Sequence, residues 1–161
     1  MTSPAALLTT ILNNRPDLTH MDQNNNKKKI LVAVTDIFFY TKIRDALLPQ
    51  GYLLERARTQ EDFSEKLGNL TPSAVILNMN DEKVDGFDAL RRVHDTQAAA
   101  SIPTLAYANH EEVDTWRKAK ELGVTKIVSR NEFSARTRGL VEELLAISDQ
   151  PATSADKTLP D

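Results

Sequence analysis

The sequence predicts an α/β fold with one doubly wound, five-stranded parallel sheet and helices on both of its faces. The main observation is that short apolar runs alternate strictly with helix-like stretches between residues 29 and 147. Such alternation, with connections of only a few residues, indicates parallel strands joined by right-handed crossovers. A second observation is that the first and third runs are apolar throughout, which is typical of strands covered on both faces.

The first two helices follow from apolar spacing and from the residues that begin and end helices. One apolar stripe predicts a helix at residues 36–48, which stops at residues 49–51. Thr59 is a typical N-cap for the second helix, which we expect to bury Phe63 and Leu67. The five strands are expected at residues 30–34, 52–55, 74–78, 102–106 and 124–129.

Three further helices follow the third, fourth and fifth strands. They are expected at residues 87–94, 111–122 and 134–146. In the helix at 111–122, acidic side chains come first and basic ones later, an order that suits the helix dipole, and Gly123 ends it.

Five strand-helix units of this kind form a flavodoxin-like sheet with the strand order 2-1-3-4-5. In that arrangement ligands bind outside the C-terminal strand ends, beside the switch point between strands one and three. The residues expected at these strand ends are Val34, Thr35, Asp36, residues 78–80, Ala108, Asn109 and Arg130.

Four segments resemble, in their order and spacing, the receiver domain of two-component response regulators. They are residues 29–36, residues 75–80 with the following Val84-Asp85-Gly86-Phe87, residues 102–108 and residues 123–130. The resemblance covers about residues 29–147. It implies a phosphate-accepting pocket at the strand ends, built around an aspartate and a bound Mg²⁺ ion.

The resemblance also implies that this chain has lost the acidic side chains of that pocket. The acidic pair that holds Mg²⁺ corresponds to Val34 and Thr35, so that only Asp36 remains, and only if the register shifts by one residue. The phosphate-accepting aspartate corresponds to Asn78. A carboxamide is neutral, a poor nucleophile and a weaker ligand for a hard cation than a carboxylate. Asp36 also fits the N-cap position of the first helix.

The remaining pocket positions differ as well. The hydroxyl residue that ends strand four and bonds the phosphoryl group corresponds to Ala108. The lysine that pairs with the phosphoryl oxygens corresponds to Arg130, and the aromatic switch residue of strand five to Ile127. Arginine keeps the charge, but its planar guanidinium is not equivalent to an ammonium group. We expect Arg130 to fill the pocket from within by bonding Asn78, Thr35 or Asp36.

These losses predict a phosphorylation-independent, receiver-like signalling module that is not an enzyme, needs no metal or cofactor, and acts by binding proteins. Two alternatives stay open. One is an atypical response regulator that accepts phosphate on Asp81 or Asp36. The other is a flavodoxin-like small-ligand sensor or enzyme, although no glycine-rich phosphate loop follows strand one.

The surface expected to bind a signalling protein, or a second copy of the chain, comprises the fourth helix, the fifth strand and the fifth helix. For Trp116, partial packing against the core is an equally good interpretation. Phe38 or Tyr40 is a second candidate for partner contact, because a helix cannot bury three consecutive positions. The candidate residues of the main surface are Trp116, Arg117, Lys120, Lys126 and Arg138.

The overall composition indicates one domain with a protein partner. The chain has 161 residues, a net charge of -3 and no cysteine. This charge provides no basic field for nucleic acid or an anionic membrane, and the lack of cysteine is typical of a reducing compartment such as the cytoplasm. We expect two tails, a disordered or weakly helical one at residues 1–28 and a disordered one at residues 148–161.

The N-terminal tail contains an apolar patch at residues 5–12. As a helix it would place Leu7, Leu8, Ile11 and Leu12 on one side and form a docking peptide. Either Met1 or Met21 fits as the natural start.

Overall fold

The computed structural model describes residues 27–96 and 99–149. Most of the two predicted tails, including the apolar patch at residues 5–12 and Met21, lies outside the described residues. Within the described part of the chain, no helix is both long enough and apolar enough to cross a membrane.

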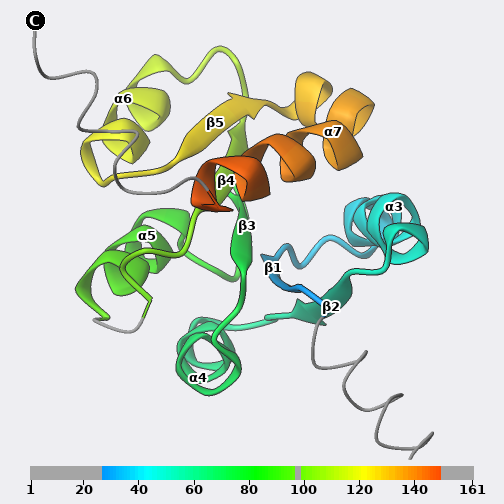
Figure 1. Cartoon of the computed structure of the whole chain (residues 1–161). Coiled ribbons are helices and arrows are strands. Elements are labelled where there is room, and N and C mark those ends of the chain that lie inside the picture. Colours follow the sequence, from blue (N-terminus) through cyan, green and yellow to red (C-terminus); the bar gives the residue numbers. More distant parts are fainter. Residues whose placement is uncertain (1–26, 97–98, 150–161) are drawn as a thin grey trace, which may run out of the picture.

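The described chain forms a five-stranded, all-parallel sheet with the order β2-β1-β3-β4-β5, which confirms the predicted fold (Figure 1). One row of paired residues crosses the whole sheet through Arg56, Val32, Ile76, Leu105 and Lys126. The strands are β1 (Lys29–Ala33), β2 (Leu53–Arg56), β3 (Ala74–Asn78), β4 (Thr104–Ala108) and β5 (Lys126–Ser129).

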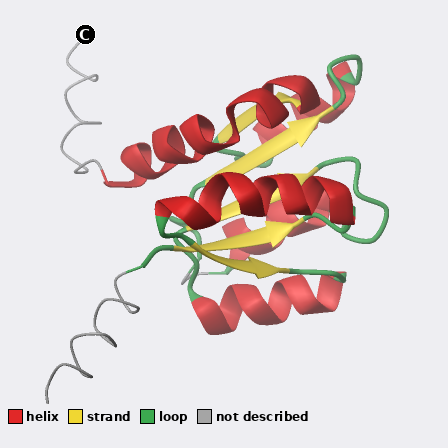
Figure 2. Ribbon diagram, turned by 90° about the vertical axis from the view of Figure 1, so that its right-hand side faces the viewer, coloured by secondary structure: helices red, strands yellow, loops and turns green. Residues whose placement is uncertain are grey.

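Helices cover both faces of the sheet, as Figures 1 and 2 show. One face carries α3 (Ile37–Leu47) and α7 (Arg130–Asp149), and a short 3-10 turn, η1 (Leu48–Gln50), follows α3. The other face carries α4 (Gln60–Leu70), α5 (Gly86–Asp95) and α6 (Val113–Glu121). Because each strand lies between two helical layers, the sheet contributes to two separate apolar cores.

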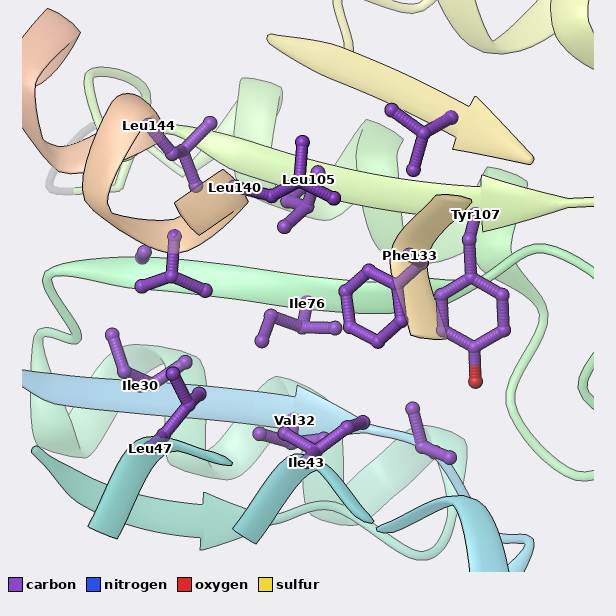
Figure 3. Close-up of a cluster of buried hydrophobic side chains, with 14 of the residues drawn as sticks. Ile30, Val32, Ile43, Leu47, Ile76, Leu105, Tyr107, Phe133, Leu140 and Leu144 are labelled. Carbon is purple, nitrogen blue, oxygen red and sulfur yellow. The ribbon is translucent and has the colours of Figure 1, made fainter. Parts of the chain in front are cut away.

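The core under α3 and α7 contains a stack of three aromatic rings near the C-terminal ends of the strands, and Figure 3 shows two of them, Phe133 and Tyr107. The Tyr107 ring centroid lies 4.7 Å from that of Phe39 and 4.6 Å from that of Phe133. All three side chains are buried, and they come from β4, α3 and α7. The stack therefore connects the sheet to both helices of this face.

Two strands begin two residues later than the sequence predicted, and local hydrogen bonds explain both differences. Ile102 donates its N–H to the Ala99 carbonyl in a turn, so β4 begins at Thr104. Thr104 and Thr125 then exchange reciprocal bonds, each N–H donating to the other's hydroxyl at 2.9 and 3.0 Å. These bonds take the place of the sheet pairing, so β5 begins at Lys126.

The helix boundaries also differ where side chains bond the backbone. The fourth predicted helix begins at Val113 rather than at residue 111, because the Glu112 carboxylate bonds across to neighbouring loops. The last helix begins at Arg130 rather than at residue 134, because the Ser129 hydroxyl accepts the Glu132 N–H at 3.0 Å. Thr59 caps α4 as predicted, by accepting the Asp62 N–H at 3.0 Å.

Candidate functional site

A hollow lies at the C-terminal ends of β1 and β3, where the strand order predicted a ligand crevice. Its volume is about 390 Å³. It is lined by Thr35, Asp36, Asn78, Asn80, Asp81, Glu82, Lys83 and Arg130.

Four of the six predicted pocket residues line this hollow, and two do not. Thr35, Asp36, Asn78 and Arg130 are lining residues. Val34 and Ala108 have no exposed surface and belong to the two apolar cores instead. Neither of these two positions therefore offers a group to a ligand in the hollow.

Asn78 ends β3 as an almost buried amide with 5% of its surface exposed. Its side-chain oxygen accepts the Asn80 N–H at 2.9 Å, and its backbone carbonyl accepts the Asp81 N–H at 3.2 Å. Both bonds fix a turn directly after the strand. The side-chain oxygen is thus bonded within its own loop.

Asp81 bridges this loop to the end of β1, a contact that the sequence analysis did not anticipate. Its two carboxylate oxygens accept the Thr35 N–H and the Thr35 hydroxyl, each at 2.8 Å. The Oδ1 atom also accepts the N–H groups of Lys83 at 2.9 Å and Val84 at 3.1 Å. Four donors therefore converge on one carboxylate, which is held as a structural acceptor.

Asp36 acts as the N-cap of α3, which the sequence suggested as one of its two roles. Its Oδ1 atom accepts the N–H groups of Phe38 at 2.9 Å and Phe39 at 3.1 Å. The other oxygen lies 3.8 Å from the Arg130 guanidinium. Of the three partners expected for Arg130, only Asp36 contacts it within the described residues. The two side chains are 40% and 44% exposed, so this ion pair is weak.

The Arg130 guanidinium lies mainly over aromatic rings. Its central carbon is 4.8 Å from the ring centroid of Phe39 and 6.0 Å from that of Tyr107. A planar cation stacks well on such faces. Arg130 therefore caps the aromatic stack at the edge of the hollow.

The Tyr107 hydroxyl lies beneath this cap, and its ring and oxygen are visible in Figure 3. No described protein group is within hydrogen-bond distance of this fully buried oxygen. Burial raises the pKa of Tyr107, while the Arg130 charge opposes that rise. The side chain is thus a neutral phenol with an unpaired hydroxyl in an apolar core.

A second hydrogen-bond network, also missed from the sequence, joins the loops after β3 and β4. The Glu112 carboxylate accepts the Asn80 amide at 2.9 and 3.0 Å, the Asn109 amide at 3.0 Å and the Thr115 hydroxyl at 3.0 Å. These bonds, Asn80 first, hold the pKa of Glu112 below its ordinary value. The signal available in the sequence was that Asn80 and Asn109 follow neighbouring strands.

The described residues contain no group of three or more His, Cys, Asp or Glu side chains placed to hold a metal ion. Asp36, Asp81 and Glu82 are the acidic residues that line the hollow, and the first two accept backbone N–H groups.

The predicted partner surface lies on α6, β5 and α7, and most of its charges are paired within the chain. Arg117 lies 3.0 Å from Asp114, Lys126 2.8 Å from Glu143, and Arg138 3.1 Å from Glu142. Lys120 is exposed.

Trp116 is half-buried and packs against the core beneath α4, α5 and α6. Its indole N–H donates to the Asn109 carbonyl at 3.0 Å. The ring is thus anchored to the loop after β4, and the rest of its surface is available to a partner. In the first turn of α3, Phe38 is 83% exposed, whereas Tyr40 is half-buried with Arg56 over its ring.

Comparison with solved structures places this architecture among receiver domains. One similar structure is a receiver domain protein from Methanospirillum hungatei, which is 14% identical and has a TM-score of 0.69; the match covers 77% of this chain and 98% of that chain. Another is a signal receiver domain from Bermanella marisrubri, which is 20% identical and has a TM-score of 0.66; the match covers 74% of this chain and 99% of that chain. A third is the phosphorylated cyanobacterial phytochrome response regulator RcpA, with 17% identity, coverage of 78% and 99%, and a TM-score of 0.66.

These structural similarities, at identities of 14–20%, establish the receiver fold that the sequence resemblance predicted. A scan against protein-family models and a sequence search of curated proteins both found no match.

Proposed function

We propose that this protein is a receiver-like signalling domain that does not accept phosphate and acts by binding another protein. The observation that carries the proposal is the Asp81 bridge to Thr35, with Asn78 at the end of β3. Asp81, one of the carboxylates that line the strand-end hollow, holds two loops together, and an amide stands where a nucleophile would be needed.

The chemistry of phosphoryl transfer supports this proposal. Transfer to a carboxylate needs a nucleophile, a metal that offsets developing charge, and a cation beside the transferred group. Asn78 is not a nucleophile, and Val34 is an apolar core residue. Asp81 already accepts four hydrogen bonds, so it would have to give some of them up before it could bind Mg²⁺ or attack phosphorus. Asp36 accepts backbone N–H groups through Oδ1 alone, and its Oδ2 atom lies 3.8 Å from the Arg130 guanidinium, whose charge disfavours a second cation there.

The loops around the hollow are also joined in a way that favours one fixed conformation. Asp81 links the β3–α5 loop to β1, and Glu112 links the same loop to the β4–α6 loop. A module that binds by a fixed surface needs no phosphoryl-driven change in these loops. We therefore assign recognition to the surface on α6, β5 and α7, with Trp116 as its apolar anchor.

The partner in this proposal is a signalling protein or a second copy of the chain, in the cytoplasm. Lys120 and the unburied part of Trp116 are the contacts we expect to matter most, because Arg117, Lys126 and Arg138 already have acidic neighbours. Breaking such exposed pairs costs little, so they would adjust to the partner.

The first test asks whether the domain accepts phosphate. Full-length protein is incubated with acetyl phosphate and Mg²⁺ for mass spectrometry, and with beryllofluoride and Mg²⁺ for amide NMR. We expect no added phosphoryl mass and unchanged signals for Thr35, Asn78 and Asp81. A phosphorylated protein would refute the proposal, and the variants Asp36→Asn and Asp81→Asn would then identify the acceptor.

The second test asks whether the α6 surface binds a partner. Affinity capture from the native cell extract is compared between the wild type and Trp116→Ala, with Glu65→Ala on exposed α4 as the matched control. We expect one protein to be lost with Trp116→Ala alone. Equal capture by all three proteins contradicts this surface, and a thermal-shift screen of metabolites then tests the small-ligand alternative.

A further inference from the structure

A second hollow opens at the opposite end of the sheet, among the beginnings of β4 and β5 and the ends of α5, α6 and α7. Its volume is about 370 Å³. Ile147 is 51% exposed here, and Ile102 and Leu122 are half-buried. The lining contains no Asp, Glu, Lys or Arg side chain, and His94 is its one titratable residue. We call this hollow the uncharged groove.

The uncharged groove lies at the same end of the sheet as the point where the described chain begins. A hollow of about 240 Å³ shares Ile102 and Pro103 with it, and shares Lys28 and Leu145 with a third hollow. Lys27, the first described residue, lines that third hollow. Figure 2 shows that β1 begins and α7 ends at this same end of the sheet. Neighbouring hollows thus lie between Lys27 and the uncharged groove.

The N-terminal segment at residues 5–12 is likewise uncharged, and it has apolar side chains that could cover Ile102, Leu122 and Ile147. Residues 1–14 include no charged side chain, and Leu7, Leu8, Ile11 and Leu12 fall on one side of a helix. The C-terminal segment, which also begins near this groove, is a poorer match. Residues 150–161 contain Asp156, Lys157 and Asp161 but a single leucine. Four other hollows in the described residues each have charged linings.

The connection between the segment and the groove has a suitable length. The 14 residues from 13 to 26 join residues 5–12 to Lys27. A flexible linker of that length has a root-mean-square span of about 20 Å. The distance from β1 to β4 is two strand spacings, or about 10 Å. A short linker gives an effective concentration in the millimolar range, so a weak apolar contact is enough to populate the docked state.

We propose that residues 5–12 of this chain dock as a short amphipathic helix in the uncharged groove. The contact is intramolecular, with the leucine and isoleucine face of the segment against Ile102, Leu122 and Ile147. Packing against the groove supplies the stabilisation that an isolated helix of this length lacks in water. The inference does not depend on the proposed signalling function.

A single spin label tests this directly, because the chain has no native cysteine. A nitroxide is attached to Ser3→Cys in the otherwise full-length, ¹⁵N-labelled protein. We expect the label to broaden the amide signals of Thr125 and Ile147, which line the groove, and to leave Phe38 at the opposite end of the sheet unaffected.

Charge substitutions in the segment provide the matched comparison. Leu8→Asp with Ile11→Asp places two charges on the docking face and should abolish the broadening. Thr9→Asp with Thr10→Asp places the same charges on the other side of the helix and should leave it intact. The proposal is overturned if the groove signals are never broadened, or if both double variants behave alike.

A mixture separates this proposal from dimerisation. Protein that carries the nitroxide but no ¹⁵N is mixed with ¹⁵N-labelled protein that carries no nitroxide. We expect no broadening of Thr125 or Ile147 in the mixture. Broadening there would assign the groove to the segment of a second copy and refute the intramolecular contact.

Discussion

Replacement of Tyr107 by phenylalanine should stabilise the protein. The substitution removes one oxygen atom and keeps the ring in its stack between Phe39 and Phe133. In the wild type that hydroxyl leaves water on folding, and no described protein group bonds it in the core. The phenylalanine variant avoids this desolvation and loses no hydrogen bond.

The size of the effect follows from the cost of an unpaired buried hydroxyl. Mutational data place that cost at about 1–3 kcal/mol. We take the lower end because the Arg130 guanidinium, 6.0 Å from the ring centroid, interacts electrostatically with this phenol. We therefore expect the free energy of unfolding to rise by about 1 kcal/mol, which moves the thermal midpoint by about 3–6 °C for a domain of this size.

Urea and thermal unfolding, followed by circular dichroism, measure this difference. Tyr52→Phe is the matched control, since it removes the same atom from a half-buried tyrosine on the same side of the sheet. The control should change the unfolding free energy by no more than about 0.5 kcal/mol, as expected for a hydroxyl near the surface.

A loss of stability in Tyr107→Phe would refute the reasoning. It would mean that the hydroxyl makes a hydrogen bond worth more than its desolvation cost, either to a bound water or to a ligand that enters from the strand-end hollow. An equal gain in Tyr52→Phe would likewise assign the effect to tyrosine in general and not to the unpaired oxygen.

Three further predictions concern other positions. Gly86→Ala should lower the free energy of unfolding by about 1–3 kcal/mol in a thermal melt. The new Cβ would lie 2.7 Å from the sulfur of the buried Met79 and 3.2 Å from its Cα, so the backbone has to shift as well as the side chain. Gly68→Ala, which enters open space, should leave the free energy of unfolding equal or higher. Asp81→Asn should cost about 1–3 kcal/mol and show coupling to Thr35→Val in a double-mutant cycle; additive effects would contradict the bridge. Because the pKa of Glu112 is lowered in the folded state, its ionised carboxylate stabilises the fold. This contribution to the free energy of unfolding is complete at pH values above the ordinary pKa of 4.5 and is lost as the pH falls through the folded-state pKa. Urea midpoints of the wild type and Glu112→Gln should thus differ at pH 7 and converge in strong acid, and a difference independent of pH would contradict this.

Much of the fold was predictable because its signals are local. Helix caps such as Thr59 and Asp36 depend on neighbouring residues alone, and apolar runs identify buried strands wherever they occur. The boundaries that differed from expectation depend on partners far away in sequence. The reciprocal bonds between Thr104 and Thr125, which delay β5, are an example.

The site shows the same limit. Loss of a carboxylate at Asn78 can be seen in the sequence, but the carboxylate that occupies the region in the structure, Asp81, reaches Thr35 across 46 positions of the chain. A pattern of residue types cannot distinguish that bridge from a solvated aspartate. Arg130 likewise matched its expected position, yet its main neighbours are the rings of Phe39 and Tyr107.

The aromatic stack also bears on when this protein can fold during synthesis. Its rings come from the first described helix, the fourth strand and the last helix, so the core beneath them closes only after α7 has been made. Contacts so distant in sequence form late and slow folding. A nascent chain that has reached β5 still exposes Phe39, Tyr107 and one whole apolar face of the sheet. Until Phe133 arrives, that face is open to aggregation and to chaperones.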